Sequence, residues 1–125
     1  MSFAAQIAII AVAVIHVLIA GVEMLGWTTL GPRVFKSLDP DLFEPTKAIA
    51  ANQGLYNLFL AAGLFWALRI VDPTWAVNIA FFFLACVIVA GVFGALTVSK
   101  TILLVQTVPA LIAAFLVYRA LPEPV

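Results

Sequence analysis

The chain has 125 residues, of which 66% are hydrophobic and only 10% are charged, and its six basic and six acidic residues leave no net charge. A soluble domain of this size has too much surface for its volume to bury so much apolar side chain. The composition therefore excludes a soluble enzyme and indicates an integral membrane protein. The neutral balance of charge argues against nucleic acid as a partner, because phosphate binding needs a basic surface.

Four stretches are apolar enough to cross a bilayer, since a spanning helix needs about 20 predominantly apolar residues. We expect these spans near residues 3–26, 47–71, 75–99 and 100–121. The apolar runs are continuous and lack the period of two that is typical of a membrane β-strand. The sequence therefore predicts an all-α fold, an integral membrane four-helix bundle that forms a single membrane domain over residues 1–125.

A long connector, residues 27–46, joins the first two spans and contains three prolines among basic, acidic and apolar residues. Long ordered loops in compact domains are often functional, so this segment is either a lid on the bundle or an ordinary amphipathic connector at the headgroups. Basic residues are slightly more frequent on the connector's side of the membrane. We therefore expect the connector in the cytoplasm and the chain in an inner (plasma) membrane.

Polar side chains inside the spans mark the candidate site, because ionisable groups at membrane depth are costly and usually face the bundle interior. His16 and Glu23 are seven residues apart, so two helical turns place them on one face, about 10 Å apart along the axis. Further candidate residues are Trp27, Asn52, Gln53, Tyr56, Asn57 and Gln106. Most of these residues fall on the connector's side of the bundle, which predicts a polar pocket that opens toward the connector. Alternatively, they form a hydrogen-bonded structural core.

The pattern His16-(x6)-Glu23-(x3)-Trp27, then NQGxYN over residues 52–57, then Gln106-x-x-Pro109 resembles a family of small bacterial and fungal membrane proteins. That family is known as a domain of unknown function, DUF1304. The resemblance covers essentially the whole chain, and NQGxYN is its most specific part. It implies four membrane helices and no established activity, so it supplies no substrate.

The candidate residues are compatible with an enzyme acting on a small hydrophobic molecule that has a polar head. His16 and Glu23 would be the catalytic acid/base pair, and Trp27 with the polar residues of the second and fourth spans would orient the ligand. Isomerisation or another redox-neutral step is the expected chemistry, because no redox motif is present. A variant of this hypothesis makes His16 an axial ligand to haem b between subunits; no other metal site is predicted.

Two further functions are open at this stage. The chain has the size of a small proton-coupled transporter, in which Glu23 would exchange protons for a cation. It would otherwise be a non-catalytic protein that binds a lipid or quinone headgroup or assists assembly. In each case the expected partners are the lipid bilayer, a small hydrophobic or amphipathic molecule and other copies of the chain in a homo-oligomer.

Overall fold

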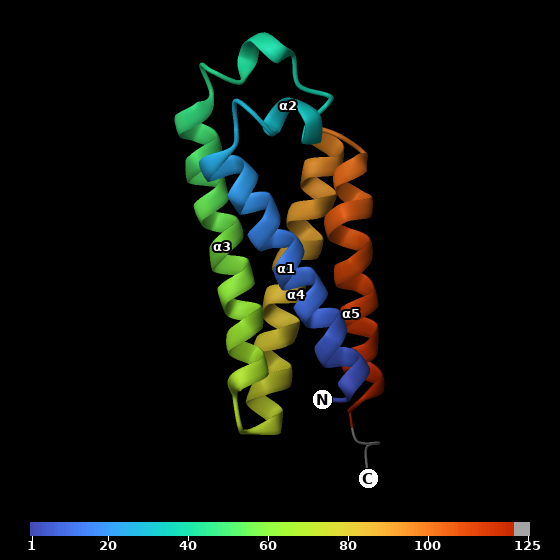
Figure 1. Ribbon diagram of the computed structural model, residues 1–125. Coiled ribbons are helices and arrows are strands. Elements are labelled where there is room, and N and C mark those ends of the chain that lie inside the picture. Colours follow the sequence, from blue (N-terminus) through green and yellow to red (C-terminus); the bar gives the residue numbers. More distant parts are fainter. Residues whose placement is uncertain (122–125) are drawn as a thin grey trace.

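The computed structural model describes residues 1–121 and shows an antiparallel bundle of long helices (Figure 1). The long helices are α1 (Phe3–Leu25), α3 (Lys47–Arg69) and α4 (Pro73–Thr97), followed by the π-helical segment η2 (Leu103–Thr107), which continues into α5 (Val108–Arg119). No strand occurs within the described part of the chain, so the predicted all-α fold is confirmed. The connector and the α4–α5 turn lie at one end of the bundle, and the N-terminus lies at the other (Figure 1).

Three of the helices, α1, α3 and α4, are long and apolar enough to cross a membrane. The fourth, Leu103–Arg119, is apolar but shorter. Large apolar side chains cover the outer faces of the bundle; Leu18, Phe82, Leu104 and Phe115 are each more than half exposed. An outer surface of this kind is typical of a protein whose solvent is lipid.

Helix ends follow local signals and differ slightly from the predicted span limits. α4 begins at Pro73, two residues before the predicted start, because Asp72 caps it: its carboxylate accepts the backbone N–H of Trp75 at 2.9 Å. Proline is well tolerated at the first helical position, where its missing N–H has no partner to lose. The fourth span is π-helical from Leu103, with the N–H of Val108 donating to the carbonyl of Leu103. This wider turn accommodates Pro109, whose ring would clash with a carbonyl four residues earlier.

Each long helix packs against two neighbours: α1 and α4 both contact α3 and α5. The half of the bundle near the N-terminus is closed by a core of small and branched residues. Its fully buried members include Ala5, Ile9, Ala13, Leu64, Leu84, Ala113 and Val117. In lipid no hydrophobic force drives helices together, so small residues that allow close contact are the main source of stability.

Glycines set the points of closest helix approach. A Cβ at Gly54 of α3 would lie 2.5 Å from Met24 Cγ and 3.2 Å from the carbonyl oxygen of Ala20, both on α1. A Cβ at Gly91 of α4 would overlap the side chain of Thr107 at the end of η2. Gly54 therefore fixes the distance between α1 and α3 near the connector, and Gly91 does the same for α4 and η2.

The connector folds onto itself as two short helical turns, α2 (Gly31–Val34) and η1 (Pro40–Leu42). Trp27 is its centre: the indole ring contacts Phe35 and Phe43, with ring centroids 5.2 and 4.9 Å away. The indole N–H donates to Thr46 Oγ1 at 2.9 Å, which joins the two ends of the connector. Aromatic contacts and this bond give the segment a defined structure.

We predict that Gly54→Ala destabilises the protein by about 1–3 kcal/mol, because the added methyl group forces α1 and α3 apart. Gly21→Ala is the matched control, since a Cβ at Gly21 meets nothing within 4 Å. Thermal unfolding in mild detergent, followed by circular dichroism, measures both variants. Equal melting temperatures for the two variants would show that the close approach at Gly54 does not stabilise the bundle.

Candidate functional site

A buried pair of polar side chains links α1 to α3 in the connector's half of the bundle. Asn57 Nδ2 donates to Glu23 Oε2 at 2.7 Å, and only 7% of Glu23 and 6% of Asn57 is exposed. The pair is adjacent to Gly54. A Cβ atom on Gly54 would lie only 3.1 Å from the Cβ of Glu23, so the absence of a side chain at Gly54 allows α1 and α3 to come this close. The close helix contact and the hydrogen bond therefore occur at the same level, and each helps to fix the other.

Glu23 and Asn57 line a cavity of about 1140 Å³ whose other lining residues come from α1, the connector, α3, α4 and residues 98–106, which precede α5. A volume of this size accommodates a drug-sized or lipid-like molecule. The deep end of the cavity is mostly apolar and includes Ile19, Phe59, Leu60, Ala90 and Val105. Polar groups of Trp27, Ser37, Gln53, Thr97 and Thr101 line the end nearest the connector. The cavity is thus amphipathic along the bundle axis, with Glu23 and Asn57 between its two ends.

The connector forms one wall of this cavity. Trp27, Phe35 and the stems of Arg33 and Lys36 line it, together with Ser37. Arg33 and Lys36 are exposed, and they place positive charge at the mouth of the cavity above the carboxyl group of Glu23. The connector therefore contributes directly to the candidate site, which makes it more than a link between two helices.

The structure brings together six of the residues that the sequence singled out, and they come from three parts of the chain. Glu23, Trp27, Gln53, Tyr56, Asn57 and Gln106 all line the cavity. Asn52 does not line it; this side chain is exposed on α3. Asn52 and Asn57 are five residues apart, so the helical rotation between them turns the two amides toward different surroundings.

His16 lies apart from the cavity lining and is completely buried in the bundle. Its Nδ1 donates to the carbonyl oxygen of Val12, one turn earlier, at 2.8 Å. This bond places the proton on Nδ1 and leaves Nε2, in the neutral ring, with a lone pair. Nε2 has no hydrogen-bond partner among the residues described. His16 is two turns deeper than Glu23, and Ile19, which lines the cavity, lies between them.

A haem group would need access to His16 Nε2, the free nitrogen of the ring. In this conformation none of the His16 side chain is exposed, so the ring does not fit an axial ligand of a haem held between subunits. Within residues 1–121 no group of three or more His, Cys, Asp and Glu side chains is arranged to hold a metal ion.

Several cavity residues were not singled out as ligand contacts by the sequence. Arg33, Lys36 and Ser37 come from the connector, whereas Phe93 and Thr97 come from α4. Their only signal in the sequence is the length of the connector and the presence of Thr97 near the end of a span whose middle is apolar. The side chains of the connector face the cavity because of how it folds around Trp27, and no spacing rule predicts that.

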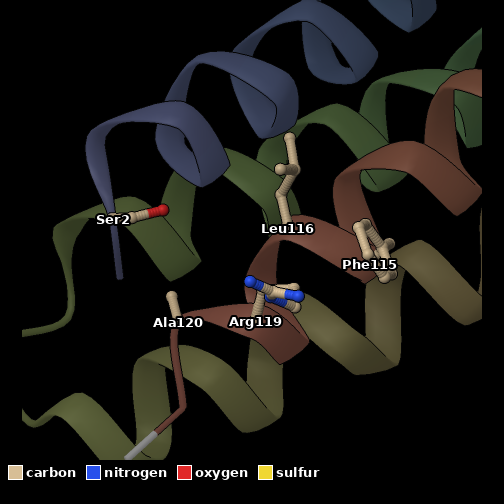
Figure 2. A pocket seen from close by; sticks show the side chains of 5 residues that line it. All are labelled: Ser2, Phe115, Leu116, Arg119 and Ala120. Carbon is tan, nitrogen blue, oxygen red and sulfur yellow. The ribbon is translucent and has the colours of Figure 1, made fainter.

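A second, smaller hollow of about 440 Å³ lies at the opposite end of the bundle (Figure 2). It is lined by Ser2 and by residues of α5 and its C-terminal end, including Phe115 and Arg119. Ser2 serves there as the helix cap, its hydroxyl oxygen accepting the N–H of Ala5. None of the predicted site residues is near this hollow, so it is not the candidate site.

Comparison with known proteins gives a family and no relative of known activity. The sequence profile of a family described as a protein of unknown function (DUF1304) matches residues 10–118. The chain belongs to the DUF1304 family. It significantly matches no curated protein and no solved structure. All the residues of the candidate site lie within the DUF1304 match, so the site belongs to the part of the chain that the family shares.

We predict that Asn57→Ala destabilises this DUF1304 protein by about 1–3 kcal/mol, because the carboxyl group of Glu23 loses its hydrogen-bond partner while it stays buried. Asn52→Ala is the matched control on the same helix; Asn52 is exposed, so its truncation changes stability by less than about 0.5 kcal/mol. The double variant Glu23→Leu/Asn57→Leu recovers much of the loss, because both polar groups are then removed.

Chemical or thermal unfolding in detergent measures these stabilities. If Asn52→Ala and Asn57→Ala lowered the midpoint equally, the Glu23–Asn57 bond would have no special role in the bundle.

Proposed function

We propose that this protein binds a small amphipathic molecule inside the membrane, with the polar head of the molecule at Glu23 and Asn57. The observation that carries this proposal is the position of the Glu23–Asn57 bond on the wall of a large cavity whose deeper end is apolar. Ionisable groups at membrane depth are costly, and those that occur there usually have a function. A ligand with a polar head and an apolar body is complementary to both ends of the cavity.

The chemistry of the pair indicates the kind of head. Asn57 donates to one carboxyl oxygen of Glu23, which leaves Glu23 Oε1 as an acceptor. A hydroxyl or ammonium group on the ligand is the natural donor to that oxygen. Gln53, Tyr56 and Gln106, from α3 and η2, supply further groups that can donate to or accept from the same head.

If the bound molecule is a substrate, Glu23 is the acid/base in contact with it. Glu23 would take a proton from one atom of the substrate and return it at another, so the reaction is a redox-neutral isomerisation. Tyr56 and Gln106 would polarise an oxygen of the substrate during this transfer. The pairing of His16 with Glu23 in catalysis stays a prediction; it requires proton transfer past Ile19, since His16 does not line the cavity.

The proposed setting is the plasma membrane of a bacterium, with the connector at the cytoplasmic surface. A location in the bilayer is supported by the length of α1, α3 and α4 and by the apolar outer faces of the bundle. The slight excess of basic residues near the connector supports the orientation. We also propose a homo-oligomer, because a chain of this size offers wide apolar faces on which a second copy can pack.

Native mass spectrometry of the protein, released from mild detergent, tests the binding proposal and reads the subunit number. We expect an excess mass from a co-purifying small molecule in the wild-type protein and in Asn52→Ala. Glu23→Gln and Asn57→Ala should lose this mass while they keep the same subunit number. The control is well matched, because Asn52 and Asn57 are asparagines of one helix and only Asn57 lines the cavity.

An adduct that persists in both Glu23→Gln and Asn57→Ala would contradict the proposed site. A transporter would be favoured instead if a cationic compound drove proton uptake into liposomes that contain the protein, and if Glu23→Gln abolished this uptake. Loss of stability in every variant with no adduct in the wild type would favour a structural role for the polar cluster.

A further inference from the structure

The cavity has a lateral opening between α3 and α4. Tyr56 and Phe59 of α3 and Phe93 of α4 all line the cavity, and yet 51, 55 and 67% of their surfaces are exposed. Such large exposed fractions in lining residues of two neighbouring helices indicate that the cavity wall is incomplete where these side chains lie. We call this opening the α3–α4 window and define it by Tyr56, Phe59, Ala90 and Phe93, which are all both exposed and part of the lining.

Helical register explains why the window is at this level. Deeper in the bundle the two helices touch, because a Cβ at Gly63 of α3 would overlap the ring of Phe83 of α4. Tyr56 is two turns from Gly63 on the same face of α3, and Ala90 is two turns from Phe83 on the same face of α4. These faces are in contact at Gly63 and line the cavity at Tyr56 and Ala90. Figure 1 shows the cause: α3 and α4 diverge from their short turn toward the connector.

Two of the other three seams have close glycine contacts at the level of the window. Gly54 brings α3 against Met24 and Ala20 of α1. Gly91 and Gly94 bring α4 against Thr107 and Ile102. The seam between α3 and α4 has its glycine contact only at Gly63, in the deeper half. The α3–α4 seam therefore has no close glycine contact at the level of Tyr56 and Phe93, and its outer side faces the hydrocarbon of a surrounding membrane.

We infer that the cavity takes its ligand sideways from the bilayer, through the α3–α4 window, and that the ligand is a membrane-dissolved amphiphile with a hydrogen-bond donor on its head. This inference rests on the proposed binding function and adds the route and the class of ligand. The window has the same polarity gradient as a leaflet: Gln53 and Thr97 flank it near the connector, whereas Phe59 and Phe93 lie deeper.

The gradient makes lateral uptake energetically favourable. An amphiphile in the leaflet already has its head at the level of the connector and its apolar body deeper. Sideways movement keeps each part at its own depth, so no polar group has to cross hydrocarbon, a step that costs several kcal/mol. Uptake of the same molecule through the mouth beside Arg33 and Lys36 would instead bring its apolar body through water and past two charged side chains.

The test measures how fast a lipid-soluble reagent reaches the far wall of the cavity. Cys86, the single cysteine, is replaced by serine, and Ile19→Cys places one thiol on α1, which does not border the window. The protein is reconstituted in nanodiscs and treated with N-dodecylmaleimide, and intact mass spectrometry follows the modification. Ala90→Trp, which narrows the window, should slow the reaction severalfold, and Phe93→Ala, which widens it, should accelerate it.

Ala85→Trp is the matched control, because Ala85 is also an exposed alanine of α4 but does not line the cavity; it should leave the rate unchanged. Ser37→Trp narrows the mouth at the connector and should also have little effect. The inference is overturned if neither Ala90→Trp nor Phe93→Ala changes the rate, or if Ser37→Trp alone slows it. If Ala90→Trp does not fold, the result of Phe93→Ala decides.

This experiment separates the route from the binding function. A normal adduct in native mass spectrometry, together with window variants that react at the wild-type rate, would refute only the route. Modification that depends on the window, in a protein that carries no adduct, would leave the route standing and refute the proposed binding.

Discussion

The hydrogen bond between Asn57 and Glu23 is the interaction on which the connector's half of this bundle depends. It joins α1 to α3 at 2.7 Å, at the level where Gly54 lets the two helices approach most closely. A carboxyl group at this depth would be costly without a partner, and in lipid the protein itself must supply one. The rest of the candidate site is arranged around this pair: the cavity borders it on one side, and the connector that begins after α1 closes over it.

The two halves of the bundle are packed differently. Near the N-terminus, alanines and branched residues such as Ala13, Leu64 and Ala113 close the core. Toward the connector, glycines mark close contacts between neighbouring helices, and a cavity with polar groups on its walls lies between the helices. The tight half supplies stability through packing. That stability allows the other half to stay hollow, and a binding site inside a membrane protein requires such a hollow.

Much of this arrangement can be predicted from the sequence, because the relevant signals are local. Continuous apolar runs give the helices, and the spacing of Glu23, Gln53, Asn57 and Gln106 places them near one level. The same reasoning is less successful for His16. A separation of seven residues puts His16 and Glu23 on one face, but two turns of rise place His16 below the cavity, bonded to Val12. Periodicity gives the direction of a side chain and does not give the depth at which a cavity ends.

Features that depend on contacts between distant segments are not predictable in this way. Trp27 illustrates this limit: the sequence singles it out as a candidate ligand contact, but its contacts with Phe35 and Phe43 and its hydrogen bond to Thr46 appear only in the structure. The proposed lateral window likewise depends on how four glycine contacts, at Gly54, Gly63, Gly91 and Gly94, are distributed over three pairs of neighbouring segments, and no single segment encodes it.

The proposed function depends above all on contact between the carboxyl group of Glu23 and the head of a bound amphiphile. Infrared difference spectroscopy tests it directly, on protein in bilayers, before and after addition of a long-chain alcohol and of a long-chain alkylamine. We expect a change in a carboxyl band of the wild-type protein that is absent in Glu23→Gln and retained in Asn52→Ala. A spectrum in which the ligand binds while no carboxyl band that depends on Glu23 changes would contradict it.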